Sequence, residues 1–178
     1  IFAMTGMSVG NAYLLPIFIG ITKVIVLVIG MFLIDRFGRR SLMILGSMGL
    51  ILFMSLIAWT FYGNHFDGPG IVFFLLGYMF FFGLSDGIVI WVFISEIFPN
   101  SIRSKGQSLG SFTHWFFAVM ISWTFPVAIN SPAIGPGHAF MFFAVMMGLQ
   151  LLFSVKLMPE TKGKTLEQIQ RDLKINYS

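Results

Sequence analysis

The sequence predicts an all-α membrane protein, and its composition and the pattern of its apolar residues both lead to this class. Hydrophobic residues make up 57% of the 178 positions, and charged residues only 10%. A water-soluble domain of this length cannot bury so much apolar surface, so lipid is the expected solvent. The apolar runs are continuous rather than alternating. Helices are therefore expected instead of β-barrel strands, because in lipid each span must pair its own backbone groups.

Five apolar segments are each long enough to cross a hydrocarbon core, which takes roughly 20 helical residues. Polar turns separate them, and a polar tail follows the last one. We therefore predict a transmembrane bundle over residues 1–158 and a tail over residues 159–178. The spans are expected at about 11–34, 41–62, 70–95, 107–130 and 138–158.

The first span contains Lys23, the one basic residue inside an apolar stretch. A lone ammonium near mid-membrane costs at least about 2.5–3.5 kcal/mol, and a Lys stem cannot snorkel from that depth to the membrane surface. At roughly 1.5 Å per residue, Lys23 lies about 18 Å from Asp35, and Asp86 in the third span lies about 15 Å from Glu96. The two residues are thus at similar depth. We expect Lys23 and Asp86 to form a contact that faces a central cavity.

The third span must deviate from an ideal helix if Asp86 is to share that cavity with Trp91. The two positions lie about 140° apart around a helix, so both face one cavity only where the span unwinds. Gly83 and Gly87 allow such unwinding. A second interpretation is close helix packing through the small-residue pair Gly83-x-x-x-Gly87, and the sequence leaves both open.

The charge pattern predicts the orientation of the bundle. Apart from Lys23, every Lys and Arg lies at or beyond the end of the first, third or fifth span, whereas the turns at 63–70 and 130–137 carry none. Basic residues stay on the cytoplasmic side, so the Arg-rich turns and the C-terminus are expected inside and the N-terminus outside. An odd number of spans with an outer start predicts a fragment of a longer protein. The net charge of +4 follows from the same rule and does not indicate a nucleic-acid partner.

The tail is expected to form a short amphipathic helix on the inner side. Thr165 and Gln168 are spaced as a capping box, and Leu166, Ile169 and Leu173 mark one helical face. The chain contains no metal-ligand pair such as His-x-x-x-His and no nucleophile with an adjacent base. We therefore expect neither an enzyme nor a bound cofactor.

Three motifs follow the first, third and fifth spans. They are Asp35-Arg36-Phe37-Gly38-Arg39-Arg40, Ser95-Glu96-Ile97-Phe98-Pro99 with Arg103, and Pro159-Glu160-Thr161-Lys162-Gly163. In this order and spacing they resemble the eighth to twelfth helices of the sugar porter family, within the major facilitator superfamily. The resemblance covers essentially the whole chain and implies the C-terminal half of a carrier.

The resemblance implies that acid–base pairs at the inner ends of the spans hold the two halves of the carrier closed. An Arg there can reach a neighbouring carboxylate as a bidentate pair. We call this set the inner latch; its expected members are Asp35, Arg36, Arg39, Glu96, Arg103 and Glu160. The alternative is that the Arg residues are ordinary topological anchors, whose exposed pairs contribute little to stability.

The resemblance also implies a sugar site near mid-membrane. Trp91 and Trp115 match the family's tenth- and eleventh-helix tryptophans, and His114 stands where relatives commonly carry Gln or Asn. An indole face covers the C–H side of a pyranose, and imidazole can hydrogen-bond a hydroxyl group. Packing or interfacial anchoring remains open for both tryptophans, and proton uptake or a bond to a neighbouring helix for His114. The candidate site residues are Trp91, His114, Trp115, Lys23 and Asp86.

One departure from the family concerns the third span. The family's tenth helix often carries prolines just before its tryptophan, whereas Asp86-Gly87-Ile88-Val89-Ile90 contains none. A proline-induced break is therefore not expected there.

Taken together, these features predict a sugar transporter that works by alternating access with proton symport, in a bacterial inner membrane. Its expected partners are a small sugar, a proton, the lipid bilayer and a missing N-terminal bundle. Alternatives are a membrane sugar sensor that does not transport, and a carrier for polyols or organic acids, for which Lys23 would suit an anion.

Overall fold

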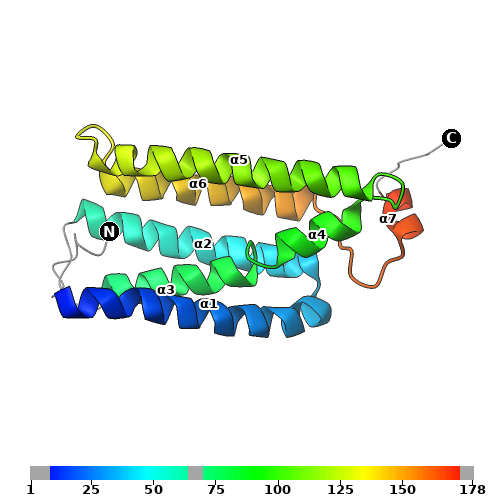
Figure 1. The fold of residues 1–178 in the computed structure, drawn as a ribbon, viewed down its shortest axis with the longest axis horizontal. Helices are drawn as coiled ribbons and strands as arrows, with labels where there is room; N and C mark the ends of the chain where they lie inside the picture. The colour runs from blue at the N-terminus through cyan, green and yellow to red at the C-terminus, as the bar shows by residue number, and fades with distance from the viewer. Residues whose placement is uncertain (1–8, 64–69, 173–178) are drawn as a thin grey trace.

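The computed structural model describes residues 9–63 and 70–172, and in these residues the chain forms helices and no strands. Figure 1 shows α1, α2, α3, α5 and α6 running along the long axis, with α7 at one end. The expected outer turn at 64–69 and Leu173 of the tail helix lie outside the described residues. The helices are α1 (Val9–Phe37), α2 (Arg39–Tyr62), α3 (Gly70–Leu84), α4 (Val89–Ile97), α5 (Arg103–Asn130), α6 (Gly135–Lys156) and α7 (Leu166–Asp172).

Five stretches of the described chain are long and apolar enough to cross a membrane, as predicted. They differ from the expected bounds mainly at the polar ends, where the helices run on into the charged residues. The first span continues to Phe37 and the fourth begins at Arg103, because helix ends in the polar region still gain backbone hydrogen bonds. The stretches are Ile17–Phe37, Arg39–Tyr62, Gly70–Ile97, Arg103–Asn130 and Gly135–Lys156.

The centre of the bundle is α2, which packs against α6 on one side and α3 on the other. Gly46 lets α3 approach closely, because a Cβ there would lie 2.1 Å from the Cβ of Ser85. Leu50 and Ile57 are completely buried on α2. By contrast, no residue in the most apolar 18-residue stretch of α5 is buried, and α5 packs mainly against α6 and α4. This leaves most of α5 open to lipid or to another bundle.

The third span is broken into α3 and α4 at Ser85–Ile88 (Figure 1). The backbone N–H of Gly87 donates to the carbonyl of Phe82 at 2.8 Å, one residue farther back than in a regular α-helix. Local unwinding, which the sequence required if Asp86 and Trp91 were to face one cavity, is present. The segment contains no proline, so the family resemblance, which associates a break here with prolines, did not predict it.

The two glycines of the third span have different neighbours. A Cβ on Gly83 would lie 2.9 Å from Cγ1 of Val26, so Gly83 lets α1 pack closely. A Cβ on Gly87 would lie 3.0 Å from both the Cα and the carbonyl oxygen of Gly83, so the broken segment folds back against the end of α3. Close packing and unwinding, the two interpretations left open by the sequence, thus occur together.

Replacing Gly46 tests the close approach of α2 and α3. We expect Gly46→Ala to destabilise the protein by about 1–3 kcal/mol, because the new methyl group meets Ser85 Cβ, which no rotamer change can move. Gly148→Ala on α6 is the matched control, since a Cβ there has no neighbour within 4 Å. Thermal unfolding of both variants in detergent micelles is the measurement. Equal melting temperatures for the two would contradict the packing.

Candidate functional site

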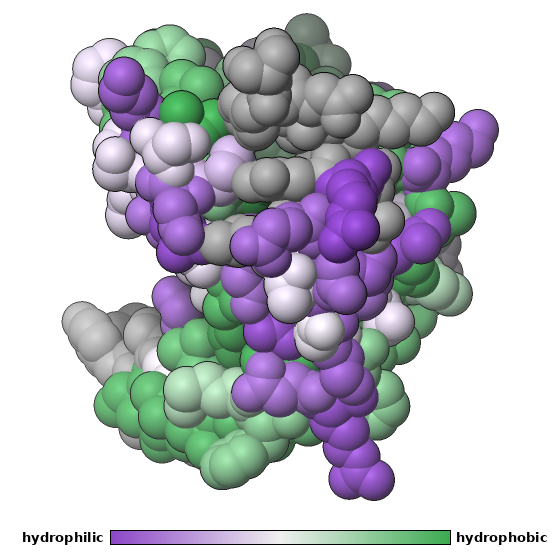
Figure 2. All heavy atoms as spheres, turned by 90° about the vertical axis from the view of Figure 1, so that its right-hand side faces the viewer, coloured by the Kyte–Doolittle hydropathy of each residue, from purple (hydrophilic) through white to green (hydrophobic). Residues whose placement is uncertain are grey.

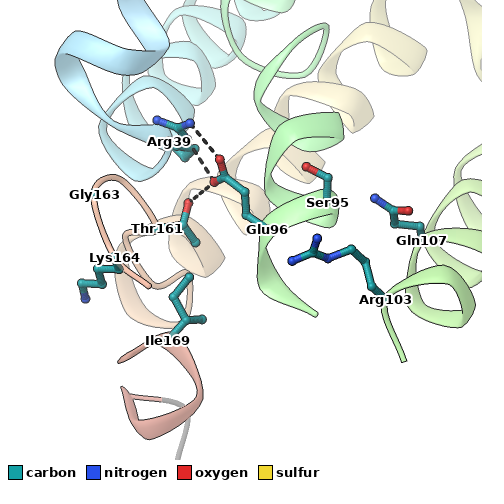
Figure 3. Close-up of a pocket in the computed structure, with 9 residues that line it drawn as sticks. All are labelled: Arg39, Ser95, Glu96, Arg103, Gln107, Thr161, Gly163, Lys164 and Ile169. Atoms are coloured by element: carbon teal, nitrogen blue, oxygen red, sulfur yellow. Dashed lines mark hydrogen bonds and ion pairs between the residues drawn. The ribbon is translucent and has the colours of Figure 1, made fainter. Parts of the chain in front are cut away.

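Charged side chains gather at one end of the bundle, where α1, α4 and α6 end, α2 and α5 begin, and α7 lies. We call this the charged end. Figure 2 looks directly at it and shows polar residues concentrated over the apolar body. A cavity of about 400 Å³ opens here, lined by Arg39, Ser95, Glu96, Arg103, Gln107, Thr161, Gly163, Lys164 and Ile169 (Figure 3).

The central interaction of the charged end is a bidentate pair between Arg39 of α2 and Glu96 of α4. Arg39 donates from Nε to Glu96 Oε2 at 3.0 Å and from Nη2 to Oε1 at 2.8 Å (Figure 3). Its Nη1 also donates to the carbonyl of Ile34 at 3.1 Å and lies 3.2 Å from Asp35. The Arg39 side chain is only 11% exposed, so water screens this pair less than a surface pair.

Glu160, after α6, supplies the N-terminal cap that α2 lacks. No side chain of the first turn of α2 caps it, and that turn holds no acidic residue. The carboxylate of Glu160 instead accepts the backbone N–H of Arg39 at 2.9 Å and that of Arg40 at 3.1 Å. An anion at this position satisfies unpaired donors and faces the positive end of the helix dipole.

The turn between α1 and α2 contains Gly38, and both the backbone conformation there and the nearby carboxylate of Glu160 require glycine. Gly38 has φ +90°, a conformation that other residues rarely adopt. A Cβ there would also lie 2.5 Å from Oε2 of Glu160. The motif glycine thus makes room for the carboxylate that caps the next helix.

Two cationic side chains, Arg40 and Lys162, donate hydrogen bonds to carbonyl groups at helix C-termini. Arg40 donates from Nε to the carbonyl of Ser154 at 3.1 Å and from Nη2 to the carbonyl of Val155, both near the end of α6. Lys162 Nζ donates to the carbonyl of Arg36 at 2.6 Å, at the end of α1. Cations at these carbonyls complement the negative ends of both helices.

The tail joins this network. Thr161 Oγ1 donates to Glu96 Oε2 at 2.6 Å (Figure 3). The predicted capping box of α7 is also confirmed. Thr165 N donates to Gln168 Oε1 at 2.9 Å and Gln168 N to Thr165 Oγ1 at 3.3 Å.

The members expected in the inner latch therefore divide into two sets. Asp35, Arg39, Glu96 and Glu160 are bonded to one another or to the backbone of this chain, and the bidentate pair is Arg39 with Glu96, a pairing that the sequence did not specify. Arg36 and Arg103 make no ion pair with any described residue. Arg103 donates only a long bond, 3.5 Å, to the carbonyl of Phe98, and its guanidinium group lines the charged-end cavity.

Farther from the charged end, α4 and α5 bring three of the predicted site residues together. The rings of Trp91 and His114 lie 5.0 Å apart at 65°, and those of His114 and Trp115 lie 5.4 Å apart at 88°. We call these three residues the aromatic cluster. Trp91 is 38% exposed and Trp115 62%, so neither indole is a core residue. No described group hydrogen-bonds the imidazole, which leaves its nitrogens available to a ligand.

The expected contact between Lys23 and Asp86 is wrong. Across residues 17–63 and 70–165, Arg39 forms ion pairs with Asp35 and Glu96. Lys23 forms no ion pair with any of these residues and is exposed on α1. Asp86 Oδ1 instead accepts a hydrogen bond from Gln150 Nε2 of α6 at 2.9 Å. Similar depth did not bring the two charges together, because the broken segment turns Asp86 towards α6.

Gln150 is the residue that sequence reasoning missed. Its signal was available, since a lone amide in an otherwise apolar span requires a polar partner. The same amide nitrogen lies 3.3 Å from Ser47 Oγ on α2. Asp86 and Gln150 therefore belong to a polar contact between α6 and the break, separate from the aromatic cluster.

Asp86 lines a cavity of about 490 Å³ that none of the aromatic cluster lines. All of its walls except Asp86 and Tyr78 are apolar. The other residues are Ile19, Leu50, Met54, Leu75, Met79, Phe82, Ile121, Phe125, Phe140, Phe143 and Met147.

A bundle of apolar helices with an ion-paired polar end and an aromatic cluster partway along its length has the architecture of a membrane transporter subdomain. The family described as "Sugar (and other) transporter" matches residues 1–173. The chain belongs to this family, the sugar porters of the major facilitator superfamily, which is a family of transporters.

Its relatives include two named symporters. The chain is 36% identical over 171 residues to the arabinose-proton symporter of Bacillus subtilis (strain 168), covering 96% of the chain and 36% of the relative. It is 36% identical over 176 residues to the D-xylose-proton symporter of Escherichia coli (strain K12), covering 96% and 35%. The chain thus spans about a third of the length of these relatives.

The fold matches a solved transporter structure. The proton:xylose symporter XylE bound to 6-bromo-6-deoxy-D-glucose superposes with a TM-score of 0.83 at 33% identity. The match covers 93% of this chain and 36% of XylE.

Glu96 and Asp35 provide a matched test of the charged end, because both carboxylates contact Arg39. We expect Glu96→Gln to destabilise the protein by about 1–3 kcal/mol, since the variant loses a bidentate pair and leaves a mostly buried guanidinium group. Asp35→Asn should cost less than about 1 kcal/mol, because the Asp35 side chain is 78% exposed. Thermal unfolding in detergent measures both. A larger loss for Asp35→Asn would contradict the assignment of Glu96 as the main partner.

Proposed function

We propose that this chain is the C-terminal half of a multi-pass sugar carrier that works by alternating access and proton symport. The observation that carries the proposal is the aromatic cluster, in which two exposed indole rings and a half-buried imidazole ring from two helices meet within a transporter bundle. The named sugar–proton symporters among the relatives support the same substrate class and coupling ion. The complete carrier would add an N-terminal bundle, and the substrate would bind between the two halves.

The aromatic cluster supplies the chemistry that a sugar requires. Indole faces pack against the C–H face of a pyranose, and the unbonded imidazole of His114 exchanges a hydrogen bond with a hydroxyl group. The edge-on contact with Trp91 holds the imidazole ring in place before the sugar arrives. Lys23, exposed on α1, remains a further candidate contact for a hydroxyl or an anionic group.

At the charged end we propose a division of roles within the inner latch. Asp35, Arg39, Glu96 and Glu160 hold α1, α2, α4 and the tail of this half together. Arg36 and Arg103, which have no ion-pair partner among the described residues, would contact carboxylates of the other half when the carrier is closed on the inner side. This extends the predicted latch without requiring the intrachain pairs to break.

The orientation follows from the same residues. The basic side chains of the charged end would lie on the cytoplasmic side, which places the C-terminal tail in the cytoplasm. The bacterial relatives favour a bacterial inner membrane.

Lys23 gives one specific reason to consider a second function, transport of a carboxylate or other organic anion. An exposed ammonium group on a span would attract such a substrate more than a neutral sugar. Competition among pentoses, hexoses, polyols and monocarboxylates for uptake separates the two functions. Inhibition by carboxylates alone would favour the anion carrier.

Counterflow of labelled sugar in proteoliposomes tests the proposed function on the complete carrier that contains this chain. With no proton gradient, we expect exchange of a labelled pentose or hexose. His114→Ala should raise the half-saturating sugar concentration by about tenfold or more, because a lost sugar hydrogen bond costs roughly 1–3 kcal/mol.

Trp123→Phe is the control, because Trp123 is exposed on α5 outside the aromatic cluster. This variant should exchange sugar like the parent carrier. Sugar binding without exchange would identify a sensor instead of a carrier. Equal effects of His114→Ala and Trp123→Phe would remove the aromatic cluster from the sugar site.

A further inference from the structure

The cavity around Asp86 contains a carboxyl group in apolar surroundings. It is lined by side chains from α1, α2, α3, α5 and α6, and Asp86 reaches it from the break between α3 and α4. A carboxylate in such surroundings is strongly disfavoured unless a cation or several donors accompany it. The one described hydrogen bond to the carboxyl group comes from a neutral amide, Gln150 Nε2 at 2.9 Å.

Among the described residues, no charged side chain besides Asp86 lines this cavity. On α1, Lys23 is exposed and forms no described ion pair, and on α3 Tyr78 is the other ionisable residue of the cavity wall. The wall residues from α2, α5 and α6 are Leu50, Met54, Ile121, Phe125, Phe140, Phe143 and Met147, none of which titrates.

Gln150 is held so that its amide points at this carboxyl group. The same nitrogen lies 3.3 Å from Ser47 Oγ and 3.3 Å from Met43 Sδ, and Ser47 Oγ donates to the carbonyl of Met43 at 2.8 Å. These contacts fix the donor side of the amide towards Asp86. They stabilise the charged form of the carboxyl group without providing a counter-ion.

We propose that Asp86 binds and releases a proton during the transport cycle, and that Gln150 is its positioning residue. This inference rests on the proposed function as a carrier. A proton fits better than a metal cation, because sodium would need several oxygen ligands, whereas the walls are apolar and Gln150 presents N–H. Within the described residues no cluster of three metal-ligating side chains occurs either. The proton would bind from water on one side of the membrane and leave to water on the other.

The break in the third span connects this proton to the sugar. Asp86 lies within the turn Ser85–Ile88, and Trp91 lies in the first turn of α4 directly after it. A change in the charge of Asp86 would alter its bond to Gln150 and hence the position of the turn. Movement of α4 would then shift Trp91 against His114. Asp86, which would bind the proton, thus lies in a short, non-helical segment that leads directly into the helix carrying Trp91, which would contact the sugar.

The test measures protons taken up per sugar by the complete carrier in proteoliposomes, with a trapped pH-sensitive dye and labelled sugar. In Asp86→Asn we expect this ratio to fall by about one proton per sugar, because an amide cannot take up the proton that a carboxylate accepts. Asp86→Glu should restore part of the proton uptake. An unchanged ratio in Asp86→Asn would overturn the inference, since Asp86 would then be a static hydrogen-bonding group.

Gln150→Met provides an independent variant if Asp86→Asn fails to fold. Removing the donor disfavours the carboxylate, so the pH at which proton-driven uptake is half-maximal should move upward. Gln150→Glu should move it upward as well, by adding a second acid. An unshifted pH profile in both would overturn the role of the pair. If the parent carrier shows no counterflow, the proposed function fails instead, which distinguishes the two failures.

Discussion

Helix ends within a membrane bundle leave backbone donors and acceptors unpaired, and the charged end satisfies them with side chains from distant parts of the chain. Glu160 caps the start of α2, Arg40 the end of α6, and Lys162 the end of α1. Each contact pairs an ion with the helix end of opposite polarity. Glu160 and Lys162 come from one short loop, so that loop ties α1, α2 and α6 together. The motif residues thus cap helix ends, and this role does not depend on the inner latch.

The second constraint is the break at Ser85–Ile88, which separates two kinds of chemistry in one span. An uninterrupted helix would place Asp86 about 140° from Trp91. In the structure, Asp86 faces the apolar cavity and Gln150, whereas Trp91 faces His114. The two residues thus contact different neighbouring helices, and the break does not bring them into one cavity as the sequence led us to expect.

Much of the fold could be predicted from the sequence, because lipid imposes simple rules on length and charge. The five spans and the capping box of Thr165 and Gln168 followed from local patterns, whereas acid–base pairing at the inner ends followed from the family resemblance, which did not specify the partners of Arg39. What could not be predicted depends on how the helices are rotated about their own axes. Lys23 and Asp86 were matched by depth alone, and depth does not determine which face of a helix meets which neighbour. Gln150 was missed for the same reason, since its partner lies 64 residues away.

The charged end and the aromatic cluster are mechanically linked through α4, which is only nine residues long. Trp91 lies in its first turn and Glu96 in its last, so the helix carries one contact to His114 and another to Arg39. A helix this short moves as a rigid rod, because its hydrogen bonds leave no internal hinge. A shift at the break would therefore tilt or displace α4 as a unit. The Arg39–Glu96 pair anchors the far end to α2, so the motion that is least opposed is a pivot about the charged end, which displaces Trp91 more than Glu96. Such a pivot would change the aromatic cluster while keeping the caps at the charged end intact.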